Sequence, residues 1–129
     1  MTRMQAAESR AYREFLCLTV EQMAERIGMT PANLARYEER GESISQDASD
    51  KIMKMVDETD AAIDVLAATL DRKHPNGRTT VVYRTDSEYR SAFPESTWTA
   101  AWHRAVTARA AMMARGPNRN RATQIVYSD

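Results

Sequence analysis

The stretch Thr19–Gly41, TVEQMAERIGMTPANLARYEERG, predicts two short helices joined by a tight turn. Thr19 begins the first helix as its cap, within a Thr-x-x-Gln capping box, and Gly28 ends this helix where the chain must turn. Thr30 caps the second helix, and Pro31 takes its first position, where a missing N–H costs no hydrogen bond. This order of caps and breakers predicts a helix-turn-helix.

Small and apolar residues mark the place where these two helices meet. Ala24 is small because the second helix is expected to cross directly above it, and Ile27, Met29 and Leu34 fill the wedge between the helices. The second helix then directs its N-terminus outward, with its free N–H groups and positive dipole, toward a phosphate or a base edge.

Helical patterns flank this motif on both sides. Residues 4–16 are rich in helix-forming residues. One face of this segment is expected to contain Ala7, Ala11, Phe15 and Leu18. Ser45 caps a further segment, 46–70, in which apolar residues recur at helical spacing. That segment is either one long helix or two helices with a bend near Thr59.

The composition changes after the turn signal Asn76-Gly77. Thr79–Tyr83 is β-branched and aromatic and predicts a strand, and Gln124–Tyr127 is a candidate for a second short strand. The first strand can pair with the second strand of its own chain or with its counterpart in another copy. The fold is therefore expected to be mainly α, with a helical domain over 1–73 and a small α+β region over 78–129.

Two helices are predicted between these strands. Thr85, in a Thr-x-x-Glu capping box, starts a short helix, and Ser96 or Thr97 caps a longer one that ends near Arg115. The apolar face of the longer helix and the first strand together suggest self-association. The residues assigned to a dimer interface are Val81, Val82, Tyr83, Trp98, Trp102 and Val106.

Composition excludes several classes of protein. The chain has 129 residues, and its 18 Lys and Arg balance 18 Asp and Glu, so a basic excess for binding nucleic acid is missing. No apolar run is long enough to cross a membrane, and the N-terminus has no signal-peptide pattern. The lone Cys17 is expected to be a small buried apolar residue in a reducing cytoplasm. His74 and His103 lack partners at metal-ligand spacing, so no metal is expected. The sequence contains no Ser/His/Asp set, phosphate loop or paired carboxylate motif, so no cofactor or enzymatic activity is expected.

The helix-turn-helix stretch resembles the Cro/C1-type family of DNA-binding proteins, also called the xenobiotic-response-element type. The matching residues are Thr19, Glu21, Met23-Ala24, Ile27-Gly28, Met29-Thr30, Leu34, Tyr37-Glu38 and a following glycine. The chain departs from the family pattern at Val20, where many members have a DNA-contacting glutamine, and at Gly41, which comes one residue late.

This resemblance implies a set of DNA-contacting residues. Base edges would be read by Pro31, Ala32, Asn33 and Arg36, and phosphates would be bound by Thr19, Gln22, Thr30 and Arg40. The alternative for Arg36 is an ion pair with Glu39 on a solvated helix face. The basic stretch 115–121 either adds phosphate contacts or is a solvated tail.

Charge is divided unevenly along the chain. Residues 1–58 contain eight Lys and Arg against eleven Asp and Glu, a balance of −3, and residues 59–129 contain ten against seven, a balance of +3. The expected reading head is therefore slightly acidic, which predicts weak non-specific binding to DNA.

A weaker resemblance covers the rest of the chain. The order of elements, with Val82-Tyr83-Arg84, Glu88–Pro94, Trp102 and Val106, is similar to phage and bacterial regulators such as the anti-CRISPR-associated autorepressors. In these proteins a C-terminal domain makes the homodimer. The chain is thus expected to be a homodimeric, sequence-specific transcriptional repressor that binds an inverted repeat in double-stranded DNA. The alternative is an antitoxin-like or inhibitor protein that binds a protein partner and keeps the helix-turn-helix as a scaffold.

Overall fold

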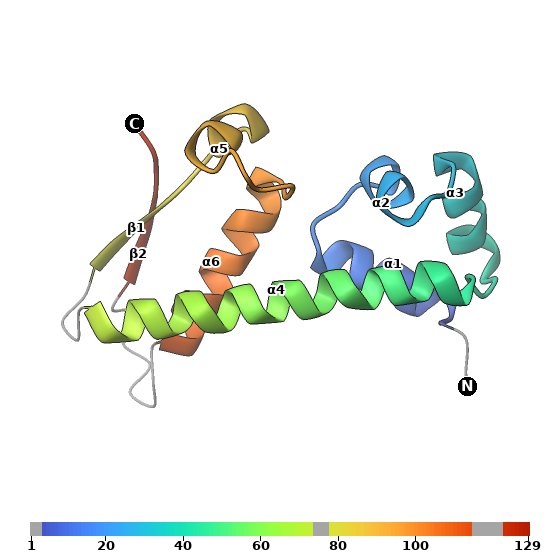
Figure 1. The fold of residues 1–129 in the computed structure, drawn as a ribbon, viewed down its shortest axis with the longest axis horizontal. Coiled ribbons are helices and arrows are strands. Elements are labelled where there is room, and N and C mark those ends of the chain that lie inside the picture. The colour runs from blue at the N-terminus through green and yellow to red at the C-terminus, as the bar shows by residue number, and fades with distance from the viewer. Residues whose placement is uncertain (1–3, 74–77, 115–122) are drawn as a thin grey trace. The chain divides into compact units, whose positions relative to one another are not determined.

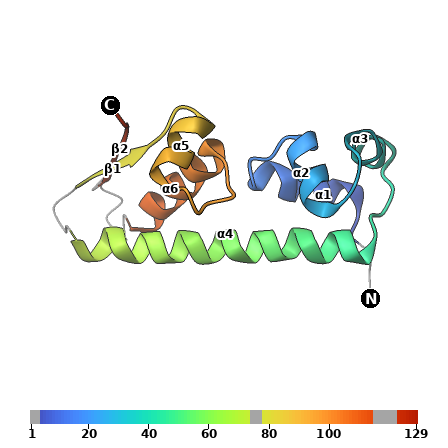
Figure 2. The same cartoon turned by 45° about the horizontal axis from the view of Figure 1, so that its top comes forward.

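The computed structural model describes residues 4–73, 78–114 and 123–129 and is mainly helical, with one small sheet. The elements in chain order are α1 (Ala6–Phe15), α2 (Val20–Ile27), α3 (Pro31–Arg40), α4 (Gln46–Lys73), β1 (Arg78–Val82), α5 (Asp86–Ala92), α6 (Ala100–Ala114) and β2 (Thr123–Tyr127) (Figures 1 and 2). The chain divides into two compact units, Met1–Glu58 and Thr59–Asp129. The division falls within α4, whereas the composition of the sequence favours a boundary after this helix.

The first unit packs α1, α2, α3 and the start of α4 around one apolar core. The side chains that close this core are buried, and they are Leu16, Leu18, Met23, Ala24, Ile27, Leu34, Ile44 and Ile52. Burying side chains of this size supplies most of the free energy that holds such short helices in place, because helices of about ten residues are marginal on their own. The unit therefore depends on tertiary packing more than on helix propensity.

The buried face of α1 differs from the one that the sequence predicts. Ala7 and Ala11 are exposed, and Ala6 and Ser9 are buried instead. Alanine contributes little apolar area on either side of a helix, so the larger side chains at the ends of α1 decide which face turns inward. Cys17 is also not fully buried; it follows the end of α1 with a φ of 57°, a left-handed conformation that few residues other than glycine adopt.

The second of the two alternatives for 46–70 is excluded, because α4 is one continuous helix through Thr59. Thr59 is buried, and its hydroxyl accepts a hydrogen bond of 3.0 Å from the indole N–H of Trp102. The rings of Trp98 and Trp102 stack at 4.6 Å with an angle of 7° between their planes. This arrangement joins α4 to α6 within the second unit.

Both predicted strands form, and they pair with each other in parallel. Arg78 lies opposite Thr123 and Val82 lies opposite Tyr127. The sheet therefore uses the partner strand of the same chain, one of the two pairings that the sequence left open. Figure 1 shows the two strands side by side.

The caps of α5 and α6 are partly as predicted. The Thr85 hydroxyl accepts a hydrogen bond of 3.1 Å from the Glu88 N–H at the start of α5. The cap of α6 is Thr99, whose hydroxyl accepts from the Trp102 N–H, and not Ser96 or Thr97. Ser96 instead shares a hydrogen bond of 2.6 Å with the Tyr89 hydroxyl, so its side chain is used by α5. The predicted turns at 76–77 and 116–117 lie outside the described residues.

Four rings, those of Tyr83, Tyr89, Phe93 and His103, form a cluster between β1, α5 and α6. The His103 ring centroid lies 5.7 Å from that of Tyr83, 5.1 Å from that of Tyr89 and 5.3 Å from that of Phe93. Its Nδ1 atom is buried without a hydrogen-bond partner. Burial, and secondly the positive charge of Arg104, hold the pKa of His103 below its ordinary value of 6.5.

Acidification should therefore destabilise the chain through His103. The unfolded imidazole protonates as the pH falls through about 6.5, whereas the folded one resists protonation, so stability is full above this pH and declines below it. Urea unfolding followed by circular dichroism at pH 7.5 and 5.5 measures the decline. His103→Phe should flatten it. An unchanged decline in His103→Phe would contradict this assignment.

Candidate nucleic-acid interface

The turn between α2 and α3 has the geometry that the sequence predicts. The Thr19 hydroxyl accepts a hydrogen bond of 3.1 Å from the Gln22 N–H, and the Gln22 side-chain oxygen accepts one of 2.9 Å from the Thr19 N–H. Gly28 ends α2 with a φ of 76°, and the N–H of the next residue returns to the Ala24 carbonyl at 2.9 Å. A side chain at Gly28 would be strained by this positive φ, so glycine is favoured here.

The start of α3 is held by its own cap. The Thr30 hydroxyl accepts a hydrogen bond of 3.1 Å from the Asn33 N–H, and Pro31 occupies the first turn. Leu34 is fully buried against the α2 side of the core. The capped N-terminus and the buried Leu34 together fix which side of α3 faces away from the core.

Three of the four predicted base-reading residues, Ala32, Asn33 and Arg36, lie on that outward side. Consecutive residues of a helix are separated by about 100° around its axis, so Ala32, Asn33, Arg36 and Arg40 share one sector of about 100°, opposite Leu34. All four of these side chains are exposed. Pro31, Thr19 and Thr30 are also exposed, although Pro31 lies about 100° around the axis from Ala32 and so outside this sector. Gln22 is half-buried because its side-chain oxygen caps α2.

Arg36 is available for a contact with a ligand. Its guanidinium carbon lies 5.4 Å from the centre of the Tyr37 ring, and the described residues place no carboxylate within ion-pair distance of it. The alternative pairing with Glu39 is therefore absent. Stacking on Tyr37 restricts the side chain without neutralising its charge.

Glu39 is exposed near these residues but is not among the DNA contacts predicted from the sequence. It lies about 20° beyond Ala32 around the helix axis, so it adds a negative charge at the edge of the surface that would face DNA. The periodicity of α3 alone is enough to place it there.

Arg13 and Glu38 fix α3 against α1. The Arg13 guanidinium donates two hydrogen bonds to the Glu38 carboxylate, of 3.0 Å from Nε and 2.9 Å from Nη2, and a third of 3.0 Å to the Leu18 carbonyl. The two side chains are only 14% and 7% exposed. The hydrogen bond to Glu38 raises the pKa of Arg13 above its ordinary value, and burial offsets part of this increase. The pair sets the position of the helix that carries Arg36.

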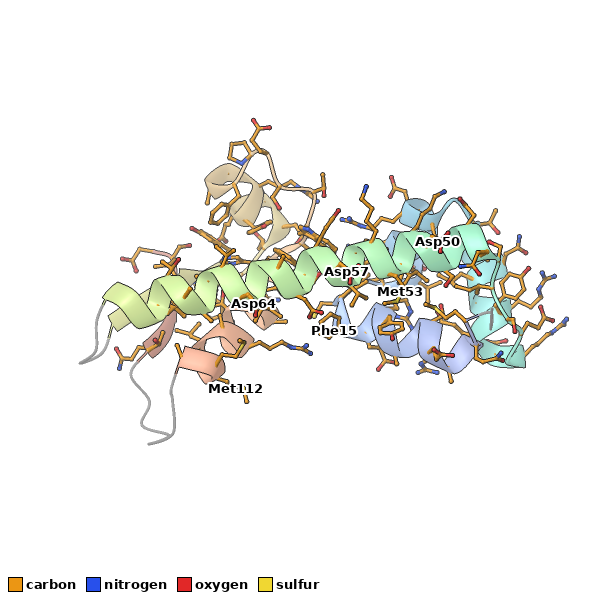
Figure 3. The ribbon with its side chains drawn as sticks, turned by 60° about the horizontal axis from the view of Figure 1, so that its bottom comes forward. Phe15, Asp50, Met53, Asp57, Asp64 and Met112 are labelled. Atoms are coloured by element: carbon orange, nitrogen blue, oxygen red, sulfur yellow. The ribbon has the colours of Figure 1, made fainter. Side chains whose placement is uncertain are left out.

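One cation of α4, Lys51, has a structural role. The Lys51 ammonium pairs with Asp47 at 3.0 Å. It also lies beside Gly28, where it would be 3.7 Å from the Cβ atom of any larger residue. A cation near the C-terminal end of α2 stabilises that helix through its dipole. Elsewhere the exposed side of α4 is acidic: Figure 3 shows Asp50, Asp57 and Asp64 along it, each exposed. This helix therefore adds little positive potential to the α3 surface.

Most residues assigned to dimerisation are core residues of the second unit. Val82, Trp98, Trp102 and Val106 are buried within their own chain, so they offer no surface to a partner. The prediction fails because Trp102 of α6 bonds Thr59 of α4 and stacks on Trp98, so these apolar side chains pack within the second unit. Tyr83 is half-buried in the ring cluster, and Val81 is exposed.

Comparison with known proteins adds no assignment. No protein-family model matches the chain, and no curated protein matches it.

None of the described helices combines the length and the apolar character needed to cross a membrane. Among the described residues, no three His, Cys, Asp or Glu side chains are grouped as metal ligands would be. The basic stretch 115–121 lies outside the described residues, so its role stays a prediction.

Proposed function

We propose that the chain is a sequence-specific DNA-binding transcriptional regulator, a homodimeric repressor of its own gene that reads an inverted repeat. One observation carries this proposal: α3 is capped and seated on Leu34, and it presents Ala32, Asn33 and Arg36 together on its exposed side. A helix held in this way at the second position of a helix-turn-helix is suited to the major groove.

Each exposed side chain of this surface has a matching partner on DNA. Arg36 can donate two hydrogen bonds to guanine, Asn33 can bond adenine or a phosphate, and Ala32 can contact the methyl group of thymine. Pro31, at the first position of α3, could add an apolar contact to a base, and Thr19, Gln22, Thr30 and Arg40 are suited to the sugar-phosphate backbone. Gln22 would donate through its amide N–H, because its oxygen is used by the cap.

Two copies of the chain would read two half-sites. A single helix of this size contacts few base pairs, and dimers of helix-turn-helix proteins place their reading helices about 34 Å apart, one turn of DNA. The charge balance of −3 over residues 1–58 means that affinity would come from placed side chains and from the second copy, and little from bulk attraction.

The proposal is tested by titrating the purified chain with the DNA upstream of its own gene and with a scrambled duplex of equal length. Fluorescence anisotropy at about 100 mM salt should show binding to the first that is at least about a thousandfold tighter. Equal affinity for the two duplexes would show that no operator is read there. Selection from random duplexes would then show whether any sequence is preferred.

Glu39→Gln should strengthen binding to every duplex. Removing a negative charge from the edge of the exposed sector of α3 lowers repulsion of the phosphates, and an exposed charge is worth about a two- to fivefold change in affinity at low salt. Glu95→Gln is the control, because Glu95 is exposed and lies in the second unit, outside the helix-turn-helix. Anisotropy titrations at two salt concentrations measure both variants. An equal gain from the two substitutions would place DNA elsewhere on the chain.

A second candidate function is a protein-interaction module in which the helix-turn-helix is a scaffold. It is favoured by the acidic balance of residues 1–58 and by the concentration of exposed apolar side chains in the second unit, such as Val65, Met112 and Met113. A pull-down that yields a stoichiometric protein partner, together with no affinity for any duplex, would support this candidate and would contradict the first.

A further inference from the structure

The exposed apolar surface of the chain lies in one unit. Within the described residues, every large apolar side chain that is exposed belongs to residues 59–129, and these are Val65, Val81, Phe93, Met112, Met113, Ile125, Val126 and Tyr127. Three of them are consecutive in β2, where Ile125, Val126 and Tyr127 are 41%, 38% and 49% exposed. A strand that exposes three such residues in a row is unusual for a surface in contact with water only.

Among the described residues, β2 itself carries none of the sequence features that usually protect a sheet edge. Within the described residues the sheet has two strands, so β2 is hydrogen-bonded to β1 on one side only. Proteins usually protect such an edge with charged residues, proline or a bulge. The sequence of β2, TQIVY, contains no charge, no proline and no glycine, and it is rich in residues that favour strands. These features indicate that the edge is paired in the functional state.

The peptide groups that face the free edge can be identified. The Ser128 N–H donates to the Val82 carbonyl at 2.9 Å, so the peptide groups of Ser128 point toward β1. Because alternate residues of a strand point to the same edge, Val126 and Gln124 also face β1. Thr123, Ile125 and Tyr127 therefore direct their N–H and C=O groups to the free edge.

We propose that β2 pairs in antiparallel fashion with β2 of a second copy, about a two-fold axis at Ile125. This register places Ile125 opposite the same residue of the second copy and Thr123 opposite Tyr127, so all the free peptide groups of these residues find partners. The side chains match as well, since β-branched and aromatic residues meet and no like charges are opposed. The result is a four-stranded sheet in the order β1-β2-β2-β1.

The edge of β1 is a weaker candidate for the same role. Val82 faces β2, so Thr79 and Val81 are the residues of β1 that face outward, and they offer fewer peptide groups than β2 does. The choice of a second copy as the partner of β2 rests on the proposed function, because a regulator that reads an inverted repeat requires a second copy related by a two-fold axis.

The test uses charge at the axis of symmetry. Ile125→Lys and Ile125→Glu each place two like charges opposite each other, and each should raise the dissociation constant of the dimer at least about tenfold, as measured by sedimentation of the full chain. An equimolar mixture of the two variants should form dimers again, because opposite charges then meet. This recovery also shows that the variants are folded. Val65→Lys, a control at an exposed apolar residue of α4, should leave the dimer unchanged.

The outcomes separate this inference from the proposed function. A monomeric wild-type chain, or dimers of Ile125→Lys as stable as the wild type, would overturn the inference; the latter would leave DNA reading intact. A wild-type dimer that dissociates in both variants and recovers in their mixture supports the pairing of β2, even where the chain shows no preference for any duplex.

Discussion

Replacing Arg13 with alanine should lower the free energy of unfolding by about 3–5 kcal/mol, because the substitution leaves the Glu38 carboxylate buried without its partner. The Leu18 carbonyl loses its donor at the same time. Urea unfolding at neutral pH, followed by circular dichroism, measures the loss. The effect is large because a charge must be taken out of water without compensation, and not because the ion pair itself is a strong source of stability.

Two comparisons distinguish this explanation from a general effect of losing arginine. Arg10→Ala removes an arginine of the same helix whose pair with Glu14 is exposed, and it should cost less than about 1 kcal/mol. The double variant Arg13→Met with Glu38→Leu removes both charges and should be more stable than Arg13→Ala. Equal losses in Arg10→Ala and Arg13→Ala would mean that the buried carboxylate is not the cause.

Local features of the fold were predictable because their causes lie within a few residues. The caps at Thr19, Thr30 and Thr85 and the breaks at Gly28 and Gly41 depend on side chains that bond the backbone three residues away, or on a positive φ. Spacing alone could not decide the buried face of α1, because several alanines fit either side equally well. The cap of α6 was misplaced because Ser96, Thr97 and Thr99 have the same chemistry, and contact of Ser96 with Tyr89 decides between them.

Contacts between distant residues account for the rest. The bond between Arg13 and Glu38 joins residues 25 positions apart, and that between Trp102 and Thr59 joins residues 43 positions apart. Neither separation leaves a periodic signal in the sequence. For this reason the outward side of α3 could be predicted from its own pattern, whereas Trp102 was assigned to a partner surface although it belongs to the core.

Arg36→Ala should weaken binding to the operator by about tenfold to a hundredfold for each half-site, since a bidentate contact with guanine is worth about 1–3 kcal/mol. The loss should fall on one base pair of each half-site, so the variant should tolerate any base there while it still discriminates at the others. Arg36 has no carboxylate partner among the described residues, so alanine removes a contact with DNA and leaves the fold intact. Anisotropy titrations against duplexes substituted one position at a time measure this pattern.

Two further arginines separate reading of bases from attraction to phosphates. Arg40→Ala, at the edge of the same helix sector, should weaken binding to all duplexes by a similar factor and reduce its dependence on salt. Arg10→Ala removes an equal charge from α1, where Glu14 already offsets it, and should change little. If Arg36→Ala instead weakens all duplexes equally, as Arg40→Ala should, then Arg36 binds phosphate, and base reading must fall to Asn33 and Ala32. Unchanged affinity in Arg36→Ala would remove α3 as the reading helix, because its outward sector has no other cation besides Arg40.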